Sequence, residues 1–78
     1  MLLKYMAMIP EKGMEVGYST EICSLRVKII SYENFGSKPV AMVKVLRKLN
    51  DDPRCHYKVG EEFPLEGKEL ESLVLDVA

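Results

Sequence analysis

Cys55 and His56 are neighbouring side chains of this chain that could supply a nucleophile and a base. A thiolate needs its base close in space, whereas adjacent residues on a strand point to opposite faces. Cys23 is the other cysteine and His56 is the sole histidine. These three residues lack the close ligand spacing and the fourth ligand that zinc sites usually show. We therefore expect Cys55 in the core and His56 in solvent, and a small metal or thiol site at Cys55 and His56 ranks last among the functions considered.

Adjacent carboxylates occur at 51–52 and 61–62, in segments that read as turns. General acid–base catalysis would require burial or a hydrogen-bonded neighbour that shifts a carboxyl pKa, and the sequence indicates neither. The glycines fit neither a G-x-G-x-x-G motif nor a P-loop. The sequence therefore predicts no enzyme activity, no metal and no cofactor.

Charge is the strongest pattern in the sequence. Residues 26–58 hold eight lysines and arginines against three acids, a local net charge of +5. Residues 59–78 hold one lysine against six acids, a local net charge of −5, so the whole chain carries only −1 at pH 7. Such asymmetry bears on partners rather than on fold. The two segments either neutralise each other within the fold or leave a charged face open to a partner.

The basic segment is a candidate for binding single-stranded nucleic acid. Small β proteins do so when cationic side chains and aromatic rings share one surface. The slightly acidic charge of the whole chain weighs against this function. The residues expected to form a nucleic-acid or partner surface are Arg26, Lys28, Tyr32, Phe35, Lys44, Arg47 and Lys48.

A protein partner is the leading prediction. We expect a non-catalytic module that binds another protein, or assembles with itself as a homodimer, through oppositely charged faces, because complementary charges orient an encounter at long range. Met42 and Leu46 fall on the polar side of their predicted strand, where they would form the apolar centre of the interface. Single-stranded nucleic acid is the alternative.

An antiparallel hairpin is expected to position these residues. Residues 21–33 and 40–49 are rich in β-branched side chains and alternate apolar with charged positions, and a turn-forming segment separates them. The alternation puts Arg26 and Lys28 on the solvent face. A helix over 40–49 is the less favoured alternative. On the second strand one face would hold Ala41, Val43, Val45 and Leu49, and the other Met42, Lys44, Leu46 and Lys48.

The remaining segments predict short elements around this hairpin. Residues 2–9 suit a strand by length, and 11–20 read as a loop. Residues 56–65 predict a strand pair at a sheet edge, because Pro64 lacks a hydrogen-bond donor. Apolar residues of 68–77 recur at i, i+3, i+4 and i+7, the pattern of an amphipathic helix.

The sequence therefore predicts a single α+β domain over residues 1–78. We expect a small, mostly antiparallel, barrel-like sheet of about five short strands with one short C-terminal helix, because closure hides strand edges. The two cysteines do not indicate a secreted scaffold, so we expect reduced thiols and a cytoplasmic protein. No segment approaches the ~20 apolar residues of a membrane span, so no membrane partner is expected.

Overall fold

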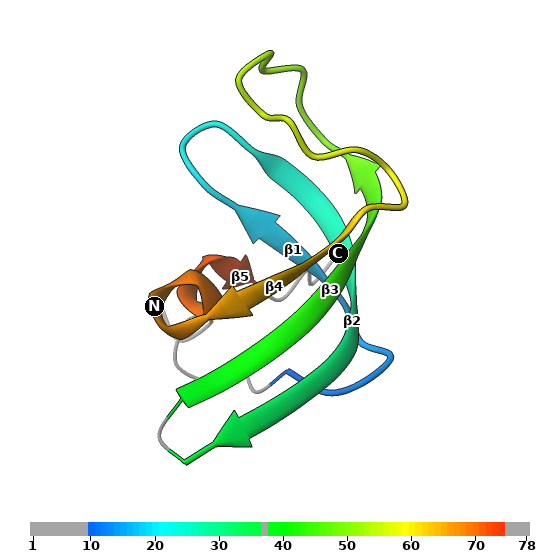
Figure 1. The fold of residues 1–78 in the computed structure, drawn as a ribbon. Coiled ribbons are helices and arrows are strands. Elements are labelled where there is room, and N and C mark those ends of the chain that lie inside the picture. The colour runs from blue at the N-terminus through cyan, green and yellow to red at the C-terminus, as the bar shows by residue number, and fades with distance from the viewer. Residues whose placement is uncertain (1–9, 37, 75–78) are drawn as a thin grey trace, which may run out of the picture.

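A computed structural model gives the positions of residues 10–36 and 38–74, and these residues form one antiparallel sheet (Figure 1). The strand order is β4-β3-β2-β1-β5, so β4 and β5 are its outermost strands. A 3-10 helix, η2, connects these two strands along the chain. The elements are β1 (Glu15–Ser19), β2 (Ser24–Phe35), β3 (Lys38–Lys48), β4 (Glu62–Glu66), η2 (Gly67–Ser72) and β5 (Leu73–Val74).

The long β2–β3 hairpin is the centre of the sheet and confirms the predicted strand pair. On β2, Leu25, Val27 and Ile29 are fully buried, and the charged residues between them reach solvent, as the alternation predicts. The turn is tighter than expected, since Phe35 already pairs with Lys38. Gly36 has a φ of +64° there, a left-handed conformation that glycine adopts without steric cost.

Two bulges interrupt the hairpin and decide which side chains share a face. Ile30 is the extra residue of β2, and Leu46 is the extra residue of β3. A bulge shifts the alternation by one residue. Arg47 consequently lies opposite Arg26 instead of falling on the core side. The expectation that Lys48 shares a face with Leu46 is wrong for the same reason.

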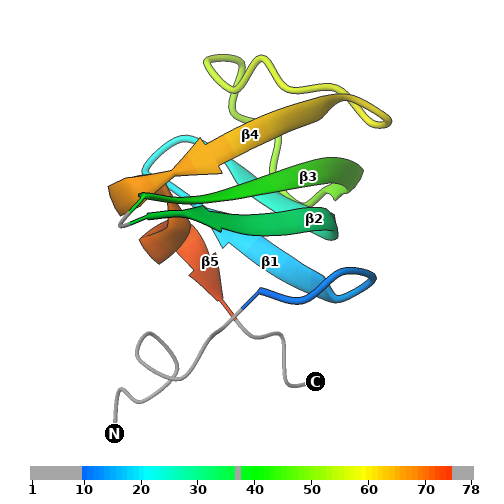
Figure 2. The ribbon, with the colours of Figure 1, turned by 60° about the horizontal axis from the view of Figure 1, so that its bottom comes forward.

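The hydrophobic core lies on one side of the curled sheet (Figure 2). Every strand contributes to it, and η2 adds the half-buried Leu70. Its buried members are Val16, Tyr18, Cys23, Leu25, Val27, Ile29, Ala41, Val43, Val45, Cys55, Phe63, Leu65 and Leu73.

The predicted barrel-like α+β fold is wrong. Among the strands that the structure describes, β4 and β5 do not pair with each other, so the sheet is open. The described residues of β5, Leu73 and Val74, pair with β1. The chain bridges the two edge strands with η2 rather than with a ladder of hydrogen bonds. The strands are antiparallel, as predicted, but the fold is an open sheet and consists mostly of β-strands.

The predicted C-terminal helix over 68–77 is also wrong. η2 is a six-residue 3-10 helix that ends at Ser72, and the chain is extended at Leu73, with φ −78° and ψ 133°. In a 3-10 helix the side chains at i and i+3 lie on one side. Leu70 and Leu73 can therefore both reach the core without an α-helix. Residues 75–78 of the predicted helix lie outside the described part of the chain.

Three further expectations concern the flanking strands. β4 is an edge strand that contains Pro64, as predicted. Residues 15–19 form β1, although 11–20 were expected to be a loop, and residues 56–61 form no strand. The strand expected over residues 2–9 lies outside the described residues.

The expectation of reduced thiols is wrong, because Cys23 and Cys55 form a disulfide. Their Cα atoms are 5.2 Å apart across a sequence separation of 32 residues. Both are nearly buried, so their assignment to the core is correct. The bond ties the β1–β2 turn to the segment between β3 and β4. No helix within 10–36 or 38–74 has the length and apolar character that a membrane crossing requires.

Candidate binding face

The side of the sheet opposite the core carries most of the predicted site residues. We call it the outer face and define it by strand alternation and bulge position on β1 to β4. Along each strand, the residues of the outer face alternate with the buried side chains of the core, except at the bulges. The outer face comprises Glu15, Gly17, Arg26, Lys28, Ile30, Ser31, Glu33, Val40, Met42, Lys44, Leu46, Arg47, Glu62, Pro64 and Glu66.

One row of this face is a line of four charges across four strands. Lys28 of β2 pairs with Lys44 of β3, and each lysine has an acid on its other side, Glu15 on β1 and Glu62 on β4. All four side chains are exposed. Opposite charges across strands stabilise a sheet, whereas like charges directly opposite each other destabilise it. The two lysines in the middle therefore carry a local cost that the outer acids only partly offset.

The next row contains a second like-charged pair, Arg26 on β2 and Arg47 on β3. The Arg26 Nε lies 3.9 Å from a Glu15 carboxylate oxygen, while Arg47 is exposed. Two adjacent rows of facing cations are unfavourable for sheet stability alone. Such local conflicts are expected where a surface serves function rather than folding.

The described part of the acidic segment places Glu62 beside Lys44 but forms no ion pair with the exposed cations Lys28, Lys44 and Arg47. Within the described residues, no carboxylate oxygen lies within 4.0 Å of the charged nitrogens of Lys28, Lys44 or Arg47. In η2, the Glu69 carboxylate instead accepts a hydrogen bond from the backbone N–H of Glu66 at 3.0 Å. Internal neutralisation of the basic segment by the acidic one is therefore incomplete on this face.

Apolar side chains adjoin the cations at the two bulges. Ile30 and Leu46 are half-buried and line one shallow groove together with Lys28 and Lys44. Leu46 also lines the neighbouring depression formed by the arginine row. Met42, half-buried, follows in the next row, between Ser31 and Pro64. The outer face thus combines a cationic end with an apolar middle.

No protein-family model, curated protein or solved structure matches this chain.

Three of the predicted binding residues lie elsewhere or are not fully described. Tyr32 pairs with the buried Ala41 and packs against the core, so it does not flank the cations. The Phe35 side chain lies outside what the structure describes. Lys48 donates a hydrogen bond from Nζ to the Cys55 carbonyl oxygen at 3.2 Å. Among the side chains of the outer face that the structure describes, none is aromatic.

Ile30 is a residue of this face that the sequence reasoning missed. Alternation with Arg26 and Lys28 assigns Ile30 to the solvent face, but the residues predicted to bind a partner do not include it. The consecutive isoleucines at 29 and 30 break the period of two, and such a break is the signal that a bulge leaves in a sequence.

The proposed thiol site at Cys55 and His56 is overturned. The Cys55 sulfur is bonded to Cys23, so no thiol remains there, and His56 is exposed. Across residues 10–36 and 38–74, no three His, Cys, Asp or Glu side chains gather as a metal site would require. The ligands that the sequence could offer are therefore not assembled in this part of the chain.

An aromatic cluster on the core side holds the 49–61 segment against the sheet. Tyr57 stacks on Phe63 with ring centroids 4.1 Å apart, and Tyr18 meets Phe63 edge-on at 5.5 Å. Burial raises the pKa of Tyr18, and the nearby Tyr57 and Glu69 raise it further. A phenol with a raised pKa stays protonated at neutral pH. We interpret the cluster as packing.

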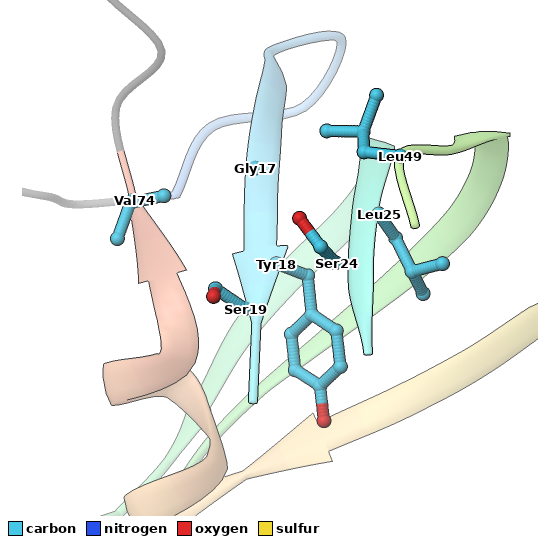
Figure 3. A pocket seen from close by; sticks show the side chains of 7 residues that line it. All are labelled: Gly17, Tyr18, Ser19, Ser24, Leu25, Leu49 and Val74. Atoms are coloured by element: carbon cyan, nitrogen blue, oxygen red, sulfur yellow. The ribbon is translucent and has the colours of Figure 1, made fainter. Parts of the chain in front are cut away.

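A small depression lies where β1, β2 and β5 meet (Figure 3). Val74 lies against Gly17 there, and a Cβ added to Gly17 would be 2.9 Å from Val74 Cγ2. Glycine is thus required for β5 to approach β1 closely. Leu49, 49% exposed, forms the opposite wall, and the lining is Gly17, Tyr18, Ser19, Ser24, Leu25, Leu49 and Val74.

Proposed function

We propose that this protein is a non-catalytic protein-interaction module whose outer face binds an acidic surface of a partner protein. One observation carries the proposal: Lys28, Lys44 and Arg47 lie exposed on adjacent rows, and no carboxylate oxygen of the described residues lies within 4.0 Å of their charged nitrogens. A partner that supplies carboxylates would relieve the repulsion within these rows. Because the repulsion is present in the free protein and is relieved in the complex, it makes binding of such a partner more favourable.

The apolar residues of the face favour a protein over a purely ionic ligand. Leu46 is half-buried between the arginine row and the lysine row, and Ile30 is half-buried beside the lysine row, so apolar surface adjoins the cations. Single-stranded nucleic acid is the weaker candidate. Stacking of bases needs aromatic rings beside the cations, and Tyr32 faces the core.

The disulfide bears on the compartment. The sequence predicts a cytoplasmic location, but cytosolic thiols are normally kept reduced. The Cys23–Cys55 bond therefore favours an oxidising compartment as the working place of the module.

A peptide-binding experiment tests the proposed face. The probe is a fluorescent peptide of about ten residues, rich in glutamate with a central leucine, and a thymidine oligonucleotide of similar length serves as the competing ligand. The test variant is Lys28→Gln/Lys44→Gln. Its matched control is Lys58→Gln/Lys68→Gln, which removes the same charge from exposed sites away from the outer face.

We expect the test variant to bind the peptide at least ten-fold more weakly than wild type at low salt. The control should change the affinity less than three-fold, and added salt should weaken binding as screening predicts. Equal losses in the two variants would contradict the proposal, because net charge rather than the outer face would then govern binding. Tighter binding to the oligonucleotide that also depends on Lys28 and Lys44 would favour the nucleic-acid alternative.

A further inference from the structure

Three lysines from three segments of the chain line the groove that contains Ile30 and Leu46. Lys28 belongs to β2, Lys44 to β3, and Lys12 to the turn before β1. All three side chains are exposed. The groove has a volume of about 490 Å³, within the range of clefts that bind a compact ligand.

The turn that carries Lys12 is held against β2. The Met14 N–H donates to the Glu11 carbonyl oxygen at 3.0 Å and closes the turn. The Gly13 N–H donates to the Ile29 carbonyl oxygen at 2.7 Å, and the Ile29 N–H donates to the Met14 carbonyl oxygen at 2.8 Å. Residues 13 and 14 thus continue the pairing of β1 with β2, so Lys12 reaches the groove from the β1 side of β2.

The groove is cationic in sum. Its charged lining residues are the three lysines and Glu62, a local net charge of 3 − 1 = +2. Among the residues that the structure describes, no carboxylate oxygen lies within 4.0 Å of the ammonium nitrogens of Lys12, Lys28 or Lys44. A ligand with two negative charges would therefore balance the groove.

Apolar surface adjoins these lysines within the groove. Ile30 and Leu46 lie on either side of the row of Lys28 and Lys44, and both are half-buried. A purely ionic ligand would leave this surface in water, and a purely apolar ligand would leave the ammonium groups without a counter-charge. A ligand that satisfies both combines two negative charges with an aliphatic group.

Acids elsewhere on the outer face confine such a ligand to the groove. Glu33 and Glu66 flank Val40 in the row that follows the row of Met42. They repel an acidic ligand from that end of the face.

We infer that the groove holds a linear segment of the partner protein in which one aliphatic side chain lies between two carboxylates. The aliphatic side chain packs on Ile30, one carboxylate contacts Lys12, and the other contacts Lys28 and Lys44. Lys12 and Lys44 lie on opposite sides of β2, about 10 Å apart at two strand spacings, and about four extended residues span this distance. The inference rests on the proposed function of the outer face and adds Lys12 to its binding residues.

A double-mutant cycle tests the aliphatic contact. The probes are fluorescent peptides of about nine residues, with glutamates on both sides of a central leucine or a central alanine. Wild type should bind the leucine peptide about ten-fold more tightly than the alanine peptide, whereas Ile30→Ala should prefer it by less than about three-fold. The matched control is Val40→Ala, which shortens a half-buried side chain of the outer face outside the groove and should keep the preference. An equal preference in all three proteins would overturn the contact with Ile30.

Two single charge changes test the lining of the groove. Lys12→Gln should weaken binding of the leucine peptide about three-fold, and Lys68→Gln, in η2, should leave it unchanged. Glu62→Gln should strengthen binding about three-fold, because it removes an acid from the groove, whereas Glu71→Gln in η2 should not. Unchanged binding by Lys12→Gln, or weaker binding by Glu62→Gln, would overturn the assignment.

The failure of this inference is distinguishable from that of the proposed function. If Lys28→Gln/Lys44→Gln weakens binding while wild type binds the two peptides equally and Lys12→Gln has no effect, the binding face stands and the groove is not its anchor. If Lys28→Gln/Lys44→Gln also leaves binding unchanged, both proposals are refuted. Displacement of the leucine peptide by octanoate at ~1 mM would assign the groove to a small amphiphilic acid and overturn the protein segment.

Discussion

Removal of the Cys23–Cys55 disulfide should destabilise the fold strongly. The bond links two segments that are 32 residues apart in sequence, and both cysteines lie in the core. In the chain-entropy description, a cross-link acts mainly on the unfolded state, by the entropy of closing the loop. For a loop of this length the effect is about 3.7 kcal/mol at 25 °C.

That figure is large beside the total stability expected of the chain. At about 0.05–0.15 kcal/mol per residue, a chain of 78 residues is stable by roughly 4–12 kcal/mol. Loss of the disulfide would therefore remove between a third and nearly all of the free energy of unfolding. Alanine is the suitable replacement at Cys23 and Cys55, because serine would bury a hydroxyl in an apolar site.

Urea unfolding of wild type and of Cys23→Ala/Cys55→Ala, monitored by near-ultraviolet circular dichroism of the tyrosines, measures the effect. With a slope of about 1 kcal/mol per molar urea, the midpoint should fall by about 3.7 M. Reductant should lower the wild-type midpoint similarly and leave the double variant unchanged. A midpoint that moves by less than ~0.5 M in both cases, or two titratable thiols in the native protein, would refute this reasoning.

Three further predictions concern single side chains. Gly17→Ala should cost about 1–3 kcal/mol in urea unfolding, because its Cβ meets Val74. The cost should shrink in a Val74→Ala background, and equal costs in both backgrounds would contradict the proposed contact. The raised pKa of Tyr18 means that stability is full below pH 10 and falls as the pH rises beyond it. Tyr18→Phe should flatten that fall, and an unchanged alkaline profile would contradict the assignment. Hydrogen bonds from Arg54 lower the pKa of Asp52 to about 2, so its contribution is present above about pH 4 and is lost as the pH falls toward 2. Asp52→Asn should remove this part of the acid dependence of unfolding, and a persisting dependence would assign it to other carboxyls.

The central hairpin was predictable because the alternation of apolar and charged residues that defines it lies within each strand. Buried Val27 and exposed Lys28 follow the alternation of their own strand, and Pro64 marks β4 as an edge by its missing donor. The C-terminal helix was not predictable in the same way. The spacing of Leu70 and Leu73 suits both an α-helix and a 3-10 turn, and the pairing of β5 with the distant β1 decided between them.

The candidate site was predictable in part. Arg26, Lys28 and Lys44 lie together on the outer face because strand alternation placed them there. Arg47 and Lys48 exchanged sides because of the bulge at Leu46, and a bulge depends on pairing with another strand rather than on the strand itself. The disulfide was missed for a related reason, since its two cysteines approach each other only when the sheet has formed.

The most direct test of the uncovered cationic face is to map where the acidic peptide binds. Titration of the peptide into isotope-labelled protein, followed by amide chemical shifts, reports the contact residue by residue. We predict that the largest changes fall on β2 and β3, at Lys28, Lys44 and Arg47 and at the bulge residues between them. Changes concentrated in η2 or in the 49–61 segment, with β2 and β3 unperturbed, would contradict the account.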